Sequence, residues 1–370
     1  MSLPVPAYGR RSLADLTPSV LAALGVPGHT NVLGLPALPR ACVLLVDGLG
    51  WELLRAHAGE APFLSSLAGH ELTAGFPSTT ATSLGSFGTG RAPGGHGLFG
   101  YQVAIPGEGR LLNCLRWDDG VDPLTWQPSA TVYERAAAAG VAAAHVSTRA
   151  FEHSGLTRAV YRGARYVPAD ALGPLVAGAE RAVRQGERSF VTVYHSELDA
   201  TGHIHGSRSS AWRHHLSFVD LLVRRLAEAM PPDAALYVTA DHGMTDPATR
   251  VDVDAEPALR EGIALLGGEP RARHLYARDG AAPDVLAVWR ERLEGAAWVM
   301  TRDEAITAGL FGPVSATMAA RVGDVVAVPY ADLAIVATQA EPLESSLVGM
   351  HGSLVPAEQL VPLLTFTAES

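Results

Sequence analysis

Lysine is missing from this chain of 370 residues, and its 28 basic residues are all arginine. The absence excludes reactions that need a lysine, such as Schiff-base formation or phosphate binding by a P-loop lysine. Cysteine is scarce as well. The two cysteines, Cys42 and Cys114, exclude a disulfide framework and a zinc knuckle built from thiolates. We expect Cys42, which lies in an apolar run, to fill the core.

Positive charge is in the minority, because 38 acidic residues outnumber the basic ones and give a formal net charge of −10. This balance argues against a surface that coats duplex nucleic acid and against a polybasic membrane patch. A bound metal can still supply the local positive charge that an anionic substrate needs. We therefore expect a small-molecule partner rather than nucleic acid or a membrane. The sequence does not define the oligomeric state.

Long hydrophobic runs are absent. No stretch reaches the length needed to cross a membrane, and the N-terminus lacks the uninterrupted apolar segment of a signal peptide. These absences predict a cytoplasmic protein. Hydrophobic residues still make up 48% of the chain, which is enough for a large core and for more than one compact unit.

The chain does contain a series of short apolar runs that read as strands. The runs cover residues 42–46, 141–146, 189–194 and 236–240. Each is continuous rather than alternating, which is typical of a parallel sheet buried on both faces. Helical stretches separate them, the clearest over residues 210–230, and His214 and His215 are assigned to the solvated flank of that helix. The order predicts a doubly wound, mostly parallel α/β sheet flanked by helices.

The stretch from residue 252 to residue 349 has a different character. It contains a predicted helix around residues 283–293 and three short predicted strands, at residues 297–300, 325–328 and 333–336. We interpret it as a small α/β cap-like subdomain. The remaining residues, 1–251 and 350–370, would form the α/β catalytic core.

Polar residues with metal-binding chemistry follow one of the predicted strands directly. The apolar run 235–240 ends at the adjacent pair Asp241 and His242. In α/β proteins, ligands bind at the carboxyl ends of strands. A carboxylate and an imidazole can both ligate a divalent cation. Alternatively, the aspartate caps the next helix and the histidine fills a gap, and the dipeptide alone does not decide between these roles.

Four further segments share this character. Asp47 ends the first predicted strand, and residues 76–83 place hydroxyls at the start of a predicted helix. Such hydroxyls can cap the helix, bind phosphate or act as a nucleophile. Asp199 and His203 are four residues apart, on a helical turn or in a tight loop. His351 lies between two glycines, which allow close backbone approach to a site.

Taken together, the segments supply three aspartates, three histidines and a hydroxyl. This inventory matches two divalent metals with nitrogen and oxygen ligands and no sulfur, zinc by preference, with manganese as the alternative. Two cations roughly 3.5–4 Å apart clamp the attacking and leaving oxygens of an in-line displacement at phosphorus. The sequence therefore predicts metal-assisted hydrolysis of a phosphate ester.

The motifs VDG, FPSTT, DATGH, TADHG and MHG, which occur in this order over residues 43–353, resemble the alkaline phosphatase superfamily. The nearest branch is the nucleotide pyrophosphatase/phosphodiesterase family, the type I phosphodiesterases. The resemblance implies one metal held by Asp199, His203 and His351. It implies a second metal held by Asp47, Asp241, His242 and the nucleophile hydroxyl.

In the family pattern, Phe-Pro followed by two residues and Thr, the nucleophile falls on Thr80, with Thr79 as the local rival. The resemblance thus implies a two-step transfer through a phospho-threonine, which water then hydrolyses. It also implies that residues 252–349 correspond to the small cap-like insertion of the family. The HLY segment at residues 274–276 and the RVGDVV segment at residues 321–326 fit that insertion.

Two departures from the family pattern bear on the substrate. Many members place an asparagine three residues beyond the nucleophile to bond a phosphoryl oxygen, and here that position is Ser83, a shorter donor. The formylglycine motif of sulfatases and the Asp-Ser-Ala segment of alkaline phosphatases proper are missing. Because of Ser83, the substrate preference cannot simply be inherited from the family, whereas the two missing motifs favour a phosphate diester or a nucleotide pyrophosphate over sulfate or a simple monoester. The enzymatic alternative is a phosphomonoesterase or phosphonate hydrolase, and the non-enzymatic one is a relict phosphate-binding protein.

Residues outside the motifs are secondary candidates. His96 could line the site or form a turn, and His195 and His205 could support the metal ligands from behind. Four aromatic residues could stack on a substrate base or pack the pocket wall: Trp51, Phe99, Tyr101 and Trp117.

Overall fold

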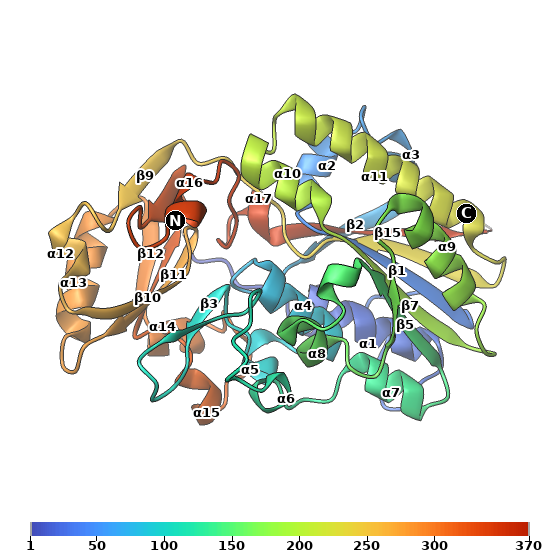
Figure 1. Ribbon diagram of the computed structural model, residues 1–370, viewed down its shortest axis with the longest axis horizontal. Coiled ribbons are helices and arrows are strands. Elements are labelled where there is room, and N and C mark those ends of the chain that lie inside the picture. Colours follow the sequence, from blue (N-terminus) through green and yellow to red (C-terminus); the bar gives the residue numbers. More distant parts are fainter. Residues whose placement is uncertain (1, 369–370) are drawn as a thin grey trace.

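The computed structural model describes residues 2–368 and is built around a seven-stranded sheet with the order β2-β15-β8-β1-β7-β5-β6 (Figure 1). The strands are β1 (Arg40–Val46), β2 (Ala68–Thr73), β5 (Ala142–Ser147), β6 (Arg165–Pro168), β7 (Ser189–His195), β8 (Ala234–Thr239) and β15 (Leu360–Thr367). Within this sheet β15 is antiparallel to both of its neighbours, and the pairs formed by the central strands are parallel. The predicted mostly parallel α/β sheet is confirmed.

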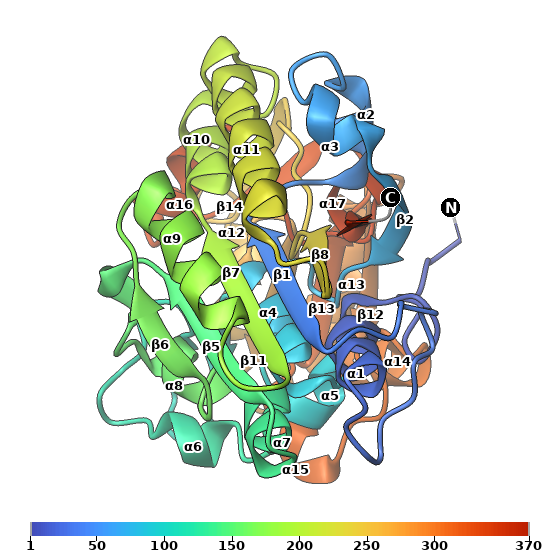
Figure 2. The same cartoon turned by 90° about the vertical axis from the view of Figure 1, so that its right-hand side faces the viewer.

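Helices cover both faces of this sheet (Figures 1 and 2). One layer contains α9 (Leu172–Val183) and α11 (Ser210–Ala229), and the other contains α1 (Leu13–Ala23), α4 (Thr80–Thr89) and α7 (Val132–Ala138). The predicted helix over residues 210–230 is therefore present. Its apolar stripe is buried because side chains at steps of three and four share one helix face.

The register of three adjacent strands brings their carboxyl ends to one level. Val46 of β1 pairs with His195 of β7, and Leu45 of β1 pairs with Thr239 of β8. All residues of β7 and β8 are buried, as their continuous apolar sequences predict. The segments that follow the three strands consequently leave the sheet side by side, at the edge where ligands bind in such folds.

A smaller sheet with the order β10-β11-β13-β12 lies at one end of the molecule (Figure 1). Its strands are β10 (Ile263–Glu269), β11 (Ala272–Ala277), β12 (Ala297–Thr301) and β13 (Val325–Pro329). α13 (Ala282–Arg292) packs on this sheet and shares with it a hydrophobic core that includes Leu275, Trp289 and Val325. The segment between residues 252 and 349 thus contains the helix and the strands expected there.

Shorter elements complete the chain. Two further strand pairs join β3 (Gln102–Ala104) to β4 (Leu111–Asn113) and β9 (Thr249–Asp252) to β14 (Leu333–Val336). The other helices are α2 (Trp51–Ala56), α3 (Pro62–Ser66), α5 (Pro93–His96), α6 (Pro123–Trp126), α8 (Gly155–Val160), α10 (Glu197–His205), α12 (Pro257–Arg260), α14 (Arg302–Thr307), α15 (Ala316–Ala319), α16 (Pro342–Ser346) and α17 (Pro356–Gln359), with a 3-10 turn at Arg149–Phe151. Within residues 2–368, none of the helices has the length and apolar character that a bilayer crossing requires.

Candidate active site

The end of β1 approaches the start of α10 closely. The backbone N–H of Asp47 donates to the carbonyl of His195 over 2.9 Å, which extends the pairing of β1 with β7 by one residue. Gly48 follows with a φ of 74°. A Cβ on Gly48 would lie 3.0 Å from the Cβ and from Oδ1 of Asp199. A glycine here therefore allows two carboxylates from different strand ends to come together.

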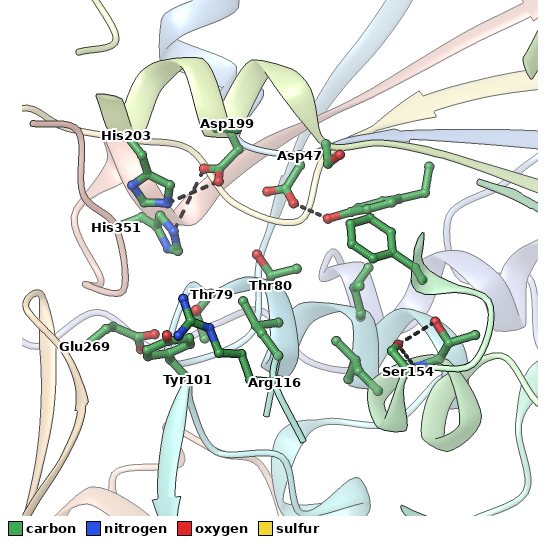
Figure 3. A pocket seen from close by; sticks show the side chains of 18 of the residues that line it. Asp47, Thr79, Thr80, Tyr101, Arg116, Ser154, Asp199, His203, Glu269 and His351 are labelled. Atoms are coloured by element: carbon green, nitrogen blue, oxygen red, sulfur yellow. Dashed lines mark hydrogen bonds and ion pairs between the residues drawn. The ribbon is translucent and has the colours of Figure 1, made fainter. Parts of the chain in front are cut away.

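The first group of candidate ligands combines one helix with a distant loop. Asp199 and His203 lie four residues apart on α10, so the helical alternative for this segment is the one that forms, and Asp199 Oδ2 lies 3.1 Å from His203 Nε2. His351 brings its Nε2 to 3.9 Å from Asp199 Oδ1. Figure 3 shows the three side chains turned toward one another, close to Thr80.

The glycine that precedes His351 lets its loop pack against α10. Gly349 N–H donates to the carbonyl of Gly202 over 3.2 Å. A Cβ on Gly349 would lie 2.6 Å from that carbonyl oxygen. The two glycines around His351 predict a close backbone approach, and Gly349 provides it.

The second group lies between β1, β8 and the start of α4. His242 Nε2 lies 3.3 Å from Asp47 Oδ1, 3.5 Å from Asp241 Oδ2 and 3.2 Å from Thr80 Oγ1. All four residues are buried. The structure thus brings Asp199, His203 and His351 together as one group and Asp47, Asp241 and His242 as another, with Thr80 beside the second.

The three histidines of the two groups are held in the same way. Each Nδ1 bonds to a backbone carbonyl: His203 to Gly349 at 2.7 Å, His242 to Gly243 at 2.9 Å and His351 to Ser78 at 2.9 Å. A carbonyl only accepts, so each Nδ1 carries the proton. In its neutral form each ring therefore offers Nε2, on the side of the carboxylates, as the ligand atom, which is the arrangement of metal-binding histidines in proteins.

The carboxylates also fit bound cations. One buried oxygen of each aspartate, namely Asp47 Oδ1, Asp199 Oδ1 and Asp241 Oδ2, has no hydrogen-bond partner among the described residues. Buried polar atoms are nearly always paired, because an unpaired one loses its hydration without compensation. Divalent cations, bound by these oxygens and the three Nε2 atoms, would supply the missing partners.

Burial and neighbouring charges shift the pKa values of the three aspartates. Burial and the neighbouring Asp199 raise the pKa of Asp47, and burial and Asp47 raise the pKa of Asp241. Burial would also raise the pKa of Asp199, but His203 and the other two histidines bring it below its ordinary value. Burial opposes protonation of His203, but Asp199 raises its pKa to about 9.

Two threonines and a serine at the start of α4 have different surroundings. Thr80 is the first residue of α4, and its hydroxyl faces His242, whereas Thr79 precedes the helix. Ser83, which stands where many family members have an asparagine, donates its hydroxyl proton to the carbonyl of Asp241 over 2.7 Å. Residue 83 lies one turn into α4, where its side chain points at the end of β8.

A cavity of about 470 Å³ opens beside Thr80. Its wall is mainly apolar and aromatic, with Tyr101, Phe151, Tyr161, Tyr194 and Leu343 among its residues. The hydroxyl of Tyr194 also donates to Asp47 Oδ2, which ties the wall to the second ligand group. The cavity is large enough for an organic group attached to a phosphate held near Thr80.

Of the four aromatic candidates, Tyr101 lines this cavity (Figure 3). Phe99 is buried against Phe311, and Trp117 donates its indole proton to the carbonyl of Val121. Trp51 lies beside Arg55. These three side chains therefore pack the protein rather than the cavity.

Glu269 lines the cavity but lies outside the motifs, on a strand of the smaller sheet. It ends β10, is 6% exposed, and neither of its carboxylate oxygens has a hydrogen-bond partner among the described residues. Burial raises its pKa to about 7. Figure 3 shows it beside Thr79 and Tyr101. No sequence signal marks Glu269, since it lies in no motif and is brought to the cavity by the fold.

The remaining histidine candidates have different surroundings. His96 is buried, donates to or accepts from Ser86 Oγ at 3.1 Å, and accepts from Leu98 N–H, so it has a structural role. His205 is exposed at the end of α10. His215, expected on the solvated flank of α11, is instead half-buried and faces His195, because α10 and α11 pack together.

The chain is similar to known proteins in sequence and in fold. The family model described as Type I phosphodiesterase / nucleotide pyrophosphatase matches residues 41–354. The search of curated proteins finds no match.

Solved structures share the fold. Murine ectonucleotide pyrophosphatase / phosphodiesterase 5, in an inactive form in complex with AMP, aligns with a TM-score of 0.70 and 18% identity over 88% of this chain and 87% of that one. Its human counterpart aligns with a TM-score of 0.69 and 16% identity, over 89% and 88% of the two chains. Phosphonoacetate hydrolase from Sinorhizobium meliloti 1021 in complex with phosphonoformate aligns with a TM-score of 0.67 and 20% identity over 89% of each chain.

Proposed function

The chain belongs to the type I phosphodiesterase / nucleotide pyrophosphatase family and is a hydrolase, and from this premise we propose that it cleaves phosphate diesters or nucleotide pyrophosphates with Thr80 as the nucleophile. The observation that carries the proposal is the common orientation of His203, His242 and His351. Each is fixed by an Nδ1 bond to a backbone carbonyl and turns its Nε2 toward buried carboxylates.

We assign two divalent cations to the two ligand groups. Asp199, His203 and His351 would hold one, and Asp47, Asp241, His242 and Thr80 the other. Zinc fits the mixed aspartate and histidine ligands best, and manganese is the alternative. Bound there, the cations would offset phosphoryl charge and lower the pKa of a water molecule to about 7.

In the proposed reaction, Thr80 gives up its hydroxyl proton and its Oγ1 attacks phosphorus, while the bond from phosphorus to the leaving oxygen breaks and the proton passes, through solvent, to that oxygen. The product of this first step is a phospho-threonine. A water oxygen then attacks the same phosphorus, the bond to Thr80 Oγ1 breaks, and the threonine regains a proton. Thr80 fits this role better than Thr79, since its Oγ1 lies 3.2 Å from His242 Nε2 within the second ligand group.

The cavity supports a substrate with an organic group on phosphorus. Its apolar and aromatic wall, which includes Phe151 and Tyr161, suits a base or another ring better than it suits water. Arg116 also lines it, and its guanidinium makes no ion pair with any described residue. A second negative charge on the substrate, as in a pyrophosphate, would pair with Arg116. Arg116 would pair equally well with a second negative charge on a phosphonate, so a phosphonate hydrolase is the second candidate.

We further propose that residues 252–349 act as a cap-like subdomain on the core formed by residues 1–251 and 350–370. In support, this segment contributes Glu269 and Leu343 to the wall of the cavity. It also has a hydrophobic core of its own. A cytoplasmic location stays a prediction, which fractionation of the source cells would test.

The decisive experiment compares substrates on chelator-treated and metal-restored protein. We expect hydrolysis of bis-p-nitrophenyl phosphate to disappear after treatment and to return with zinc or manganese. The diester should be cleaved at least about tenfold faster than p-nitrophenyl phosphate. Faster cleavage of the monoester, or release of phosphate from phosphonoacetate, would favour the alternative enzymes. Two bound ions without any hydrolysis would identify a relict binding protein.

A further inference from the structure

A second cavity, of about 290 Å³, lies beside the first, on the outer side of Tyr194. Ser147, Tyr194 and Ser196 belong to the walls of both cavities. The second cavity is also lined by two imidazoles and a carboxylate that play no part in the proposed reaction. These are His195 at the end of β7, Glu197 in the first turn of α10, and His215 on α11.

The three side chains converge. His195 Nδ1 lies 2.9 Å from Glu197 Oε2, and His195 Nε2 lies 3.0 Å from His215 Nε2. The carboxylate accepts the Nδ1 proton, so the Nε2 of a neutral His195 ring accepts a hydrogen bond from His215 Nε2, and a cation would take the place of the shared proton. Two imidazole nitrogens that each lie about 2.0–2.1 Å from a single zinc ion are roughly 3 Å apart. The observed separation matches that geometry.

We propose that His195, Glu197 and His215 form a third divalent-cation site, separate from the two ligand groups beside Thr80. The two Nε2 atoms are the nitrogen ligands. Glu197 orients His195 and balances the charge, in the manner of the carboxylate–histidine–metal arrangements of known sites. One ligand atom from each of the three side chains lies within 4.8 Å of the others. Water in the cavity completes the coordination.

The surroundings favour a cation. The wall of the second cavity contains two carboxylates, those of Asp170 and Glu197, and no arginine. Burial and the neighbouring His195 both lower the pKa of His215, which favours the neutral ring that cation binding requires. Glu197 is 57% exposed, which leaves an open path from solvent to the site.

An ion at this position would link α10, which carries Asp199, to the long helix α11. Glu197 and Asp199 lie two residues apart on α10, whereas His215 belongs to α11. Binding would therefore clamp the first turn of α10, the segment that positions Asp199, against α11. It would do so without occupying the cavity beside Thr80, because Tyr194 and Ser196 separate the two.

The test counts zinc ions on the full chain. Protein stripped by a chelator is dialysed against zinc, and bound zinc per chain is measured by elemental analysis. We expect three ions for the unmodified chain and two for His215→Ala. The matched control is His214→Ala, which removes the exposed neighbouring histidine of the same helix and should leave three ions bound. Glu197→Gln should weaken the third binding event about 10- to 100-fold, as expected for loss of an orienting carboxylate.

The proposal depends on the difference between the unmodified chain and His215→Ala, not on the absolute count. Equal zinc contents in these two proteins would overturn it, and so would an equal loss in His214→Ala, which would reveal an unspecific surface ion. The absolute count tests the two sites of the proposed function separately. If those sites were absent, the unmodified chain would bind one ion and His215→Ala none. Far-UV circular dichroism establishes that each variant is folded.

Discussion

Thr80 and His242 meet at 3.2 Å, hydroxyl oxygen to ring Nε2, although 162 positions separate them in the sequence. The backbone carbonyl of Gly243 holds the proton of His242 on Nδ1, so the ring presents a lone pair at this contact. The same lone pair faces Asp47 and Asp241. A cation bound at this point would touch the hydroxyl that we propose as the nucleophile.

Removal of that hydroxyl should therefore stop turnover and spare the metal sites. For Thr80→Ala we expect hydrolysis of bis-p-nitrophenyl phosphate to fall at least about a thousandfold, the scale of losing a nucleophile. Zinc content should stay within one ion of the unmodified protein. Thr79→Ala, the matched control, should keep its activity within about tenfold. Activity retained in Thr80→Ala and lost in Thr79→Ala would transfer the role to Thr79.

Asp241→Asn should make the metal-free protein more stable and the metal-bound protein less so. The substitution retains the Oδ1 that accepts from Gly48 and His242 N–H, and it removes a buried charge next to Asp47. We expect metal-free protein to gain about 1–2 kcal/mol in the free energy of unfolding. The increase in Tm on adding zinc should shrink in parallel. An equal zinc-induced increase in both proteins would contradict a ligand role for Asp241.

Glu269→Gln tests whether the unpartnered carboxylate beside Thr79 serves the substrate. The substitution keeps the shape of the side chain and removes its charge. Since both oxygens lack partners in the described structure, we expect them to accept from a donor on the substrate. A lost hydrogen bond to a charged group costs about 1.5–3 kcal/mol, so kcat/KM for a substrate that carries such a donor should fall about tenfold or more. Bis-p-nitrophenyl phosphate, which carries no such donor, is the control substrate and should be cleaved as before.

The stability of the fold should decrease in mild acid because of His96. This side chain is buried, and its Nδ1 accepts a proton from Leu98 N–H, so only the neutral ring fits. Burial, together with Arg321 and Arg91, lowers its pKa from 6.5 to about 3. Between these values the unfolded chain binds a proton that the folded chain does not, so the free energy of unfolding falls as pH falls from 6.5 toward 3.

Denaturant unfolding between pH 7 and pH 4 measures this dependence. In His96→Gln the decrease should be shallower than in the unmodified chain, because the titrating ring is gone. His205→Gln is the control, since His205 is exposed. A decrease of the same slope in His96→Gln would show that other groups account for the acid sensitivity.

The sequence predicts the main sheet and the ligand residues for one physical reason. Each of the three central strands is a buried apolar run that ends in a polar segment, and parallel neighbours end at the same edge. Asp47 and Asp241 follow β1 and β8 directly, so their proximity follows from the strand order. The sequence also places Asp199 and His203 near this edge, because both lie on the helix that follows β7.

Side-chain directions set by packing between distant elements escaped prediction. Glu269 reaches the cavity only because the smaller sheet packs beside the core, and no local pattern records that contact. The direction of the Ser83 side chain, one helical turn after Thr79 and toward the carbonyl of Asp241, follows from the packing of α4 against the end of β8. The period of its own helix predicts His215 in solvent, whereas His195, at the end of β7, lies against it.

The bond between His203 and the carbonyl of Gly349 joins residues 146 positions apart. Together with His351, it closes the intervening chain, which contains the whole smaller sheet, into one large loop. An ion shared by Asp199, His203 and His351 would act there as a removable cross-link, and closing a long loop restricts the unfolded chain more than closing a short one. Metal supply would then control how long the protein survives proteases in addition to whether it turns over substrate.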